Sequence, residues 1–296
     1  IEEISVDNIA VKANVALLCL PNGISSTLTR GLLDKGVKVI DLSADYRYKS
    51  LDQWKKVYSK EAEKYNRDDN DLCKEAVYGL PEINNKDISN ARLIACPGCY
   101  PTSALIPLTP FLSQGIIDRE GLVIDSKSGT SGGGREPNQK LLYSECGDGI
   151  SAYGLINHRH TSEIEQIAGF ISGNDIELIF TPHLIPMTRG MHSTIYGRLR
   201  DPGLTSSDCR IILENYYRNY SNIKVLPVDI YPSTKWVRNT NEIHISVKVD
   251  NRNGRIIILS VIDNLIKGQT GQAIQNLNLI SGLPINHGLE MINHFP

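Results

Sequence analysis

The sequence predicts an α/β domain joined to an α+β domain, and three observations in the 296-residue chain lead to this prediction. In the first third, short apolar runs alternate with segments of helical spacing, which is typical of a parallel sheet covered by helices. Near the carboxyl end, two runs with apolar and polar residues in alternation are separated by a turn, which indicates an antiparallel hairpin. A chain of this length most often forms two domains.

The first domain begins with a strand–helix–strand unit. Residues 15–20 form a continuous apolar run of the buried-strand type, and residues 25–34 have leucines at helical spacing. Gly36 then ends that helix, and residues 37–42 form the next buried strand. Tight turns between these segments predict a parallel βαβ unit.

Two loops of this unit leave the carboxyl ends of its strands. They are residues 20–24, which contain a Pro-Asn-Gly turn, and residues 41–47, which contain two aspartates and an arginine. Open parallel sheets bind ligands at this edge. We therefore expect both loops to contribute to a binding site.

Cys99 lies where a third short strand ends and a helix begins. The apolar run 93–95 is followed by a Pro-Gly turn, and residues 101–112 form the expected helix, with Pro101 in its first turn. Unpaired amides and the positive end of the helix dipole favour a thiolate at such a position, which is suited to a nucleophile. A small buried apolar cysteine is the alternative interpretation.

The second domain contains a glycine-rich loop. Residues 122–125 form the expected strand, and residues 126–135 follow with three consecutive glycines between Lys127 and Arg135. The backbone of such a loop can approach a ligand closely. A flexible linker is the alternative.

The expected hairpin lies further along the chain. Residues 243–249 alternate between apolar and polar side chains, residues 250–254 turn, and residues 255–262 return. Residues 270–280 then have helical spacing. We expect one face of this antiparallel part of the sheet to be exposed to solvent.

Composition excludes several classes of protein. The net charge is −2 and no basic stripe is present, so we expect no nucleic-acid partner. No apolar run is long enough to span a bilayer, and we expect no membrane partner. The six cysteines are too widely spaced for a disulfide scaffold, which favours a reducing, cytoplasmic setting. No histidine, cysteine or carboxylate spacing completes a metal site, so none is expected.

An ordered series of stretches carries a resemblance to one family. The stretches are residues 18–23, 39–47, 78–82, 97–102, 127–135, 157–165, 181–191 and 263–272. Together they resemble the N-acetyl-γ-glutamyl-phosphate reductases, whose larger kin are the aspartate-semialdehyde dehydrogenases. The series spans nearly the whole chain, and its order makes the resemblance specific.

The resemblance implies a division of the chain. Residues 1–98 and 264–296 would form a parallel dinucleotide-binding domain, and residues 99–263 a catalytic and dimerisation domain with a mixed or antiparallel sheet. A homo-oligomer, dimer or tetramer, is implied. The family opens with a strand and a G-x-x-G-x-x-G turn, whereas this chain starts after that point, so we expect a fragment whose first domain is incomplete. Residues 15–20 would then lie at an unpaired sheet edge.

The resemblance also implies the reaction. An NADPH-dependent reduction of N-acetyl-L-glutamyl 5-phosphate would give the 5-semialdehyde and phosphate, through a thioester on Cys99, in arginine biosynthesis. The acid/base group would be His158, and histidine suits that task at neutral pH. His192 is the rival, because its Gly-Met-His-Ser context resembles that of the semialdehyde dehydrogenase histidine. His183 and His244 are interpreted as structural.

Further site residues follow from the same resemblance. The small-molecule acyl-phosphate substrate would be bound by Arg47, Arg159, His160 and Arg189. NADP would be bound by Pro21, Ser43, Ser128, Gly129, Gly132, Gly133 and Asn264. Thr161 reads as the cap of a helix that follows the two neighbouring histidines.

Three other interpretations remain open. An aspartate-semialdehyde dehydrogenase would use the same chemistry on a different acyl phosphate. A thiol-redox protein is suggested by Cys96, which stands where the family has asparagine and creates a Cys-x-x-Cys motif with Cys99. A non-catalytic fragment is suggested by the absence of the glycine-rich cofactor turn.

Overall fold

The computed structural model describes residues 5–290, which divide into two compact units. The first unit comprises the residues up to Gly98 together with Gln272–His287, and the second comprises Cys99–Gly271. The described residues after His287 group with the second unit. The chain thus returns to the first unit at Gln272, later than residue 264.

The first unit contains a four-stranded parallel sheet, as the strand–helix–strand pattern predicted. Its order is β1-β2-β4-β3. The strands are β1 (Val15–Leu18), β2 (Lys38–Asp41), β3 (Val77–Tyr78) and β4 (Leu93–Ala95). β1 is an edge strand, which agrees with the expectation for this segment.

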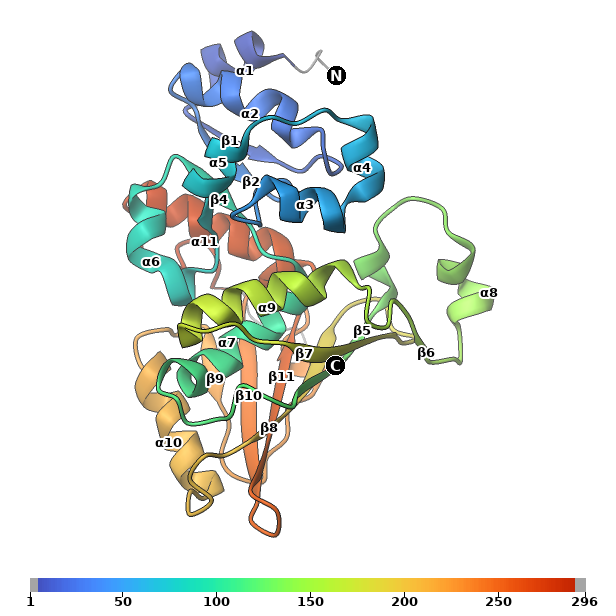
Figure 1. Ribbon diagram of the computed structural model, residues 1–296, viewed down its shortest axis with the longest axis vertical. Coiled ribbons are helices and arrows are strands. Elements are labelled where there is room, and N and C mark those ends of the chain that lie inside the picture. The colour runs from blue at the N-terminus through green and yellow to red at the C-terminus, as the bar shows by residue number, and fades with distance from the viewer. Residues whose placement is uncertain (1–4, 291–296) are drawn as a thin grey trace. The chain divides into compact units, whose positions relative to one another are not determined.

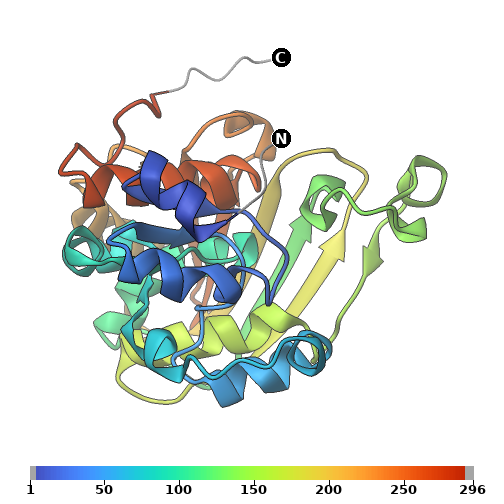
Figure 2. The same ribbon diagram turned by 90° about the horizontal axis from the view of Figure 1, so that it is seen from above.

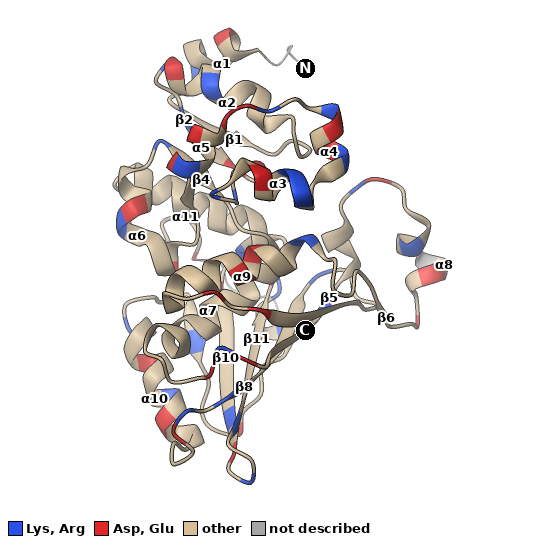
Figure 3. Cartoon of the chain, viewed as in Figure 1, with Lys and Arg blue, Asp and Glu red and all other residues tan. Residues whose placement is uncertain are grey.

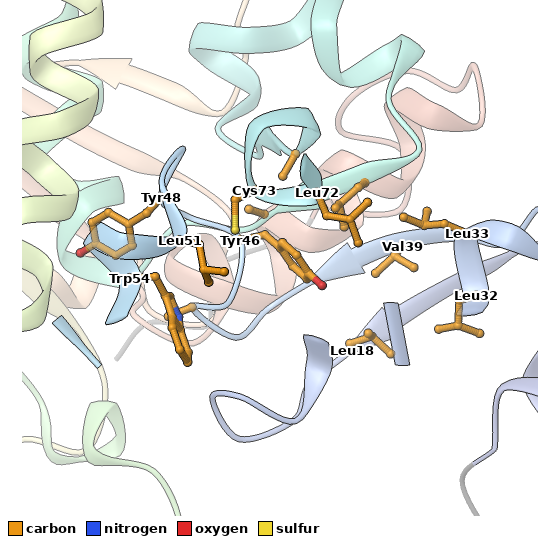
Figure 4. Close-up of a cluster of buried hydrophobic side chains, with 14 of the residues drawn as sticks. Leu18, Leu32, Leu33, Val39, Tyr46, Tyr48, Leu51, Trp54, Leu72 and Cys73 are labelled. Atoms are coloured by element: carbon orange, nitrogen blue, oxygen red, sulfur yellow. The ribbon is translucent and has the colours of Figure 1, made fainter. Parts of the chain in front are cut away.

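Helices cover the sheet of the first unit. They are α1 (Val6–Lys12), α2 (Ser25–Asp34), α3 (Leu51–Val57), α4 (Ser59–Lys64), α5 (Asn70–Glu75), α6 (Pro81–Asn90) and, from the end of the chain, α11 (Gly271–Ile280). One core contains Trp54, Tyr46 and Leu72 (Figure 4). A second core joins Ala273 of α11 to Ile94 of β4, so the carboxyl-terminal helix completes this unit.

The second unit contains a seven-stranded mixed sheet in the order β6-β7-β5-β8-β11-β10-β9. The strands are β5 (Leu122–Ser128), β6 (Ser151–Ala152), β7 (Leu178–Leu184), β8 (Met191–Arg198), β9 (Ile223–Val225), β10 (Ile243–Asp250) and β11 (Arg255–Ile262). β10 and β11 form the predicted hairpin, closed at the pair Asp250 and Arg255. β5 pairs with β7, and β9 with β10, in parallel, so the sheet is mixed rather than antiparallel.

Three helices pack against the sheet of the second unit (Figures 1 and 2). They are α7 (Cys99–Ser113), α9 (Arg159–Ser172) and α10 (Ser206–Tyr217). Every residue of α7 from Tyr100 to Leu112 is buried. The predicted helix 101–112 is thereby confirmed, but it begins earlier, at Cys99 itself.

Short helical turns lie between the strands of this unit and, in the case of η4, after the last strand. They are η1 (Thr130–Gly133), η2 (Gln139–Leu141), α8 (Tyr143–Cys146), η3 (Thr234–Trp236) and η4, a π-helix (Ile266–Thr270). The connection from β5 to β6, which carries α8, extends away from the sheet (Figure 1). Lysines and arginines are interspersed with carboxylates throughout the chain (Figure 3). None of the helices in the described part of the chain is long and apolar enough to cross a membrane.

Candidate active site

The second unit contains a pocket of about 500 Å³. Its walls come from the start of α7, the glycine-rich turn after β5, the turn η2, and the segment that leads from β6 into α9. The predicted site residues that line it are Cys99, Ser128, Gly129, Gly132, Gly133, His158, Arg159 and His160.

Cys99 is the first residue of α7 and lies at the pocket wall, where it is only partly buried. The π-helix η4 packs directly against it. A Cβ atom built on Gly268 would lie 2.8 Å from the Cβ of Cys99, which is closer than real Cβ atoms approach. Gly268 therefore lets η4 hold Cys99 in place, and the interpretation of Cys99 as a buried core cysteine does not fit this position.

Cys96 is in a different environment, in the first unit. Its side chain is 2% exposed, and the amide of Asn276 donates a hydrogen bond to its sulfur at 3.5 Å. Burial raises the pKa of Cys96 to about 12, so the thiol stays protonated at neutral pH. A protonated buried thiol is a poor nucleophile, which argues against thiol–disulfide exchange at this motif.

His158 is the N-cap of α9. Its Nδ1 atom accepts a hydrogen bond from the backbone N–H of His160 at 3.1 Å. The helix thus begins at Arg159, so the prediction of Thr161 as the cap was wrong; an imidazole nitrogen takes the place of the usual hydroxyl. Burial, and then the charge of Arg159, lower the pKa of His158 to about 4, which keeps the ring neutral at pH 7.

Aromatic rings hold the imidazole of His158 on several sides. The ring centroids of Tyr100, Tyr153 and Phe180 lie 5.7, 5.4 and 5.3 Å from its own. The ring of His160 is 4.9 Å away. Contacts of this kind leave the ring little freedom to rotate, so its orientation toward the pocket is fixed.

His160 is buried beside His158 and faces an acidic residue. Its side chain is 8% exposed, and its Nε2 atom is 4.0 Å from a carboxylate oxygen of Glu163, which is fully buried. The two residues lie on adjacent turns of α9. This pair places a carboxylate behind the second histidine of the pocket.

Three further histidines lie elsewhere in the second unit. His192 on β8 is opposite Lys127 on β5 and does not line the pocket. His183 Nδ1 is 3.1 Å from a carboxylate oxygen of Asp125, and His244 Nε2 is 2.8 Å from that of Glu242. The structure therefore brings His158, and not His192, to the pocket that contains Cys99.

Arg189 and Asn264 do not line the pocket either. The Nε atom of Arg189 is 3.3 Å from the buried carboxylate of Asp263, and its Nη1 atom donates to Asn239 at 2.7 Å. Asn264 accepts a hydrogen bond from the N–H of Gly190 at 2.8 Å and donates to Ser131 at 2.9 Å. Asn264 thus ties the glycine-rich turn to the loop before β8.

The glycine-rich turn is ordered by contacts with the protein. A Cβ atom on Gly129 would lie 2.7 Å from the carbonyl oxygen of Met187. A Cβ atom on Gly133 would lie 2.4 Å from Leu141 Cδ1. A Cβ atom on Gly132 would lie 3.0 Å from the hydroxyl oxygen of Ser128. These close approaches favour an ordered loop over a flexible linker.

The predicted loops of the first unit are joined to each other. The N–H of Gly23 donates to Asp45 at 2.7 Å, and the N–H of Ala44 donates to Asn22 at 3.1 Å. Pro21 is exposed at the carboxyl end of β1. The hydroxyl of Ser43 donates to buried Asp41 at 2.8 Å. The two loops therefore form one ordered edge, as expected for adjacent parallel strands.

Arg47 is buried beneath this edge. Its side chain donates from Nε to the carbonyl oxygen of Cys96 at 2.8 Å and from Nη2 to that of Leu42 at 3.3 Å. The guanidinium is thereby fixed to the ends of β2 and β4 within the first unit.

Sequence reasoning missed several residues of the pocket wall. Lys140, Tyr153 and Asn157 all line the pocket. Lys140 and Tyr153 belong to the irregular connection between β5 and α9, where no periodicity or motif marks individual residues. Asn157 is the first residue of the stretch 157–165 that carries the resemblance. The hydroxyl of Tyr153 is 3.0 Å from that of Tyr100, which joins this connection to α7.

Two family models match the chain. Residues 1–91 match the semialdehyde dehydrogenase NAD binding domain, and residues 99–264 match the semialdehyde dehydrogenase dimerisation domain. Among solved structures, aspartate semialdehyde dehydrogenase II from Vibrio cholerae has a TM-score of 0.70 at 16% identity, with 93% of this chain and 81% of that chain covered. The enzyme from Candida albicans, solved with NADP, has a TM-score of 0.66 at 15% identity, with 92% and 78% covered. At these identities the likeness shows the fold.

Curated relatives are much closer in sequence. The N-acetyl-gamma-glutamyl-phosphate reductase of Prochlorococcus marinus subsp. pastoris is 90% identical over 296 residues, which are 100% of this chain and 84% of the relative. That of P. marinus strain MIT 9515 is 88% identical with the same coverage. That of strain NATL1A is 60% identical over 292 residues, with 99% and 81% covered.

Proposed function

Because the chain belongs to the N-acetyl-gamma-glutamyl-phosphate reductase family, we propose that it reduces N-acetyl-L-glutamyl 5-phosphate to N-acetyl-L-glutamate 5-semialdehyde and phosphate, with NADPH, in arginine biosynthesis. One observation carries the proposal beyond the family name. Cys99, at the start of a helix, shares a pocket with the neutral imidazole of His158.

Cys99 is the proposed nucleophile. Its sulfur attacks the acyl carbon, the bond from that carbon to the phosphate oxygen breaks, and inorganic phosphate leaves with the thiol proton. The product on the protein is a thioester. The amides of the first turn of α7 favour negative charge on the sulfur before attack. Gly268 keeps the sulfur in position, because η4 packs against the Cβ of Cys99.

His158, in its neutral form, is the proposed hydrogen-bond donor to the reacting carbonyl. Since its Nδ1 atom accepts from the backbone of α9, the neutral ring carries its proton on Nε2. That N–H can stabilise the carbonyl oxygen of the acyl group as negative charge develops on it. Protonation of Nδ1 would break the cap of α9, which also favours the neutral donor form.

The residues of both units fit a nicotinamide nucleotide. In the first unit, the joined loops after β1 and β2 form the edge at which parallel sheets hold such nucleotides. In the second unit, the turn from Ser128 to Gly133 presents backbone at the pocket. We assign Pro21, Ser43 and this turn to the cofactor, with Asn264 holding the turn. When bound, NADPH supplies the hydride that reduces the thioester to the level of the aldehyde.

Anionic groups of the substrate require cations. Arg159 is the proposed partner of the acyl phosphate, because its charge acts on His158 and a guanidinium binds phosphate in a bidentate manner. Buried Arg47 remains a proposed phosphate ligand from the first unit. Arg189 is committed to Asp263, so we propose for it an indirect role in fixing the loop before β8.

We propose that two copies of the chain associate through the sheet of the second unit, whose matching family model is a dimerisation domain. Ile179 on β7 is 62% exposed and Tyr196 on β8 is 38% exposed. Both pair with Val123 on β5, so they form one apolar row across neighbouring strands. Light scattering should show a dimer that Ile179→Lys weakens, and a wild-type monomer would refute the assignment.

The free state of the cysteines accords with a cytoplasmic enzyme.

The experiment for the activity runs the reaction in the direction of aldehyde oxidation. Purified protein should reduce NADP⁺ in the presence of N-acetylglutamate semialdehyde and phosphate. Aspartate semialdehyde, tested in parallel, should be a poor substrate. Greater activity with aspartate semialdehyde would move the assignment to the sibling enzyme, and activity with neither would refute an acyl-phosphate reductase.

A further inference from the structure

We propose that Lys140 recognises the α-carboxylate of the substrate and thereby selects acyl phosphates that carry a negative charge at the end remote from the reacting carbonyl. The inference rests on the proposed function, since it assigns one end of that substrate to one residue of the same pocket. Lys140 lines the pocket with Cys99 and His158.

The charge of the pocket wall is the first support. Among the described residues that line it, the permanent cations are Lys140 and Arg159, and none is an aspartate or a glutamate. A wall with two cations and no carboxylate attracts an anionic ligand. The substrate carries two separate anionic groups, the phosphate and the α-carboxylate, which matches the two cations in number.

The positions of the two cations divide these groups between them. Arg159 directly follows His158 at the start of α9, and its charge lowers the pKa of that histidine. Arg159 therefore lies at the reacting end, where the phosphate is attached. Lys140 enters the pocket from η2, on the side of the glycine-rich turn. The remote carboxylate is the anionic group left for Lys140.

The backbone that carries Lys140 is held in a defined position. The Oδ1 atom of Asn138 accepts a hydrogen bond from the N–H of Lys140 at 3.0 Å. Leu141, the next residue, occupies the space that a side chain on Gly133 would fill. Gly133 and Leu141 thus anchor η2 to the turn at the pocket wall. The absence of a side chain on Gly133 therefore makes room for Leu141 as well as for a cofactor.

The side chain of Lys140 remains available. It is exposed, and no carboxylate of the described residues forms an ion pair with its ammonium. A lysine ammonium is a compact charge on a flexible stem, which suits a single carboxylate at a variable reach. The arginine at the other end suits the flatter, bidentate contact with phosphate. The two residue types agree with the two anions.

The test compares two aldehydes that differ only in the carboxylate. N-acetylglutamate semialdehyde has it, and 4-acetamidobutanal is the same chain without it. Oxidation by phosphate and NADP⁺ is measured for the wild type, Lys140→Gln and Lys140→Arg. Lys140→Gln should lower kcat/KM for N-acetylglutamate semialdehyde (the acid) roughly 10- to 100-fold, which is the range for losing a charged hydrogen bond. For 4-acetamidobutanal (the analogue), kcat/KM should change less than about twofold. Lys140→Arg should retain much of the selectivity.

Lys60→Gln is the matched control, because it removes a surface lysine of α4 in the first unit and should change neither rate. Equal losses with both aldehydes for Lys140→Gln would overturn the inference, as would an unchanged preference for the acid. A raised KM for phosphate or NADP⁺ instead would assign Lys140 to those anions and also overturn it. A wild-type enzyme inactive toward the acid would refute the proposed function and the inference together.

Gly133→Ala supplies an independent variant. The new methyl group would displace Leu141, and Lys140 with it, so selectivity for the acid should fall as it does in Lys140→Gln. In the Lys140→Gln background the same change should add little, because coupled residues are non-additive. Full additivity of the two losses would contradict the anchoring of Lys140 through Leu141.

Discussion

Gly268→Ala should misplace the nucleophile. Gly268 is buried in η4, and the added methyl carbon would lie 2.8 Å from Cys99 Cβ and 3.4 Å from both Cys99 Cα and Ile262 Cδ1. The first distance is well inside van der Waals contact, and the atom it meets belongs to the start of a buried helix rather than to a flexible tip. Either η4 or the first turn of α7 must move.

The size of the effect follows from this geometry. Overpacking of a well-packed site costs typically about 1–3 kcal/mol of unfolding free energy. A displacement of about 1 Å at reacting atoms can lower the rate roughly 100-fold. We therefore expect kcat/KM to fall about 10- to 100-fold and the free energy of unfolding to fall by about 1–3 kcal/mol.

The assay combines steady-state rates, urea unfolding and alkylation of Cys99 by iodoacetamide. Gly149→Ala is the matched control, because its methyl group would meet nothing nearer than 3.9 Å and its backbone is not left-handed. Alanine is otherwise the better helix former by about 1 kcal/mol, so a stabilised Gly268→Ala variant with normal turnover would refute the contact as a positioning device.

The remaining predictions concern the cysteines and histidines. Cys99→Ser should abolish turnover, whereas Cys96→Asn should keep it; steady-state rates decide, and normal turnover in Cys99→Ser would refute the thioester. His158→Asn should cut kcat roughly 100- to 10,000-fold and His192→Asn much less; the reverse ranking would exchange their roles. Because the folded protein holds the pKa of His158 at about 4 against 6.5 for the ordinary residue, the unfolded chain binds the proton first. The free energy of unfolding should therefore fall as pH drops from about 6.5 to about 4, and less so in His158→Asn; equal slopes in urea titrations would contradict the assigned shift.

The local pattern of the sequence was sufficient for several main elements of each unit. The apolar run at 15–20 corresponds to strand β1, and the alternation at 243–249 corresponds to strand β10. The glycine at 36 follows the end of helix α2. Such signals are local, since burial on one face or both faces of an element repeats along the chain itself. The position of Cys99 between a strand and a helix could be predicted for the same reason.

Capping and loop contacts were harder to predict. Thr161 has the chemistry of an N-cap, yet the imidazole of His158 takes that role because rings from α7 and β7 hold it in place. The glycines of the turn after β5 signalled a close approach, but the sequence could not show that Leu141 approaches Gly133. Both outcomes depend on segments that are distant in the chain or irregular.

The sequence by itself determined the parallel first sheet, the hairpin of the second unit and the placement of Cys99 at a helix start, because periodicity and turn residues act over a few neighbours. Only the tertiary structure decided that the second sheet is mixed, that Arg189 pairs with Asp263, and that Lys140 joins the pocket of Cys99. Those outcomes require side chains from separate elements to pack together, and the free energy of that packing depends on three-dimensional neighbours that no local pattern records.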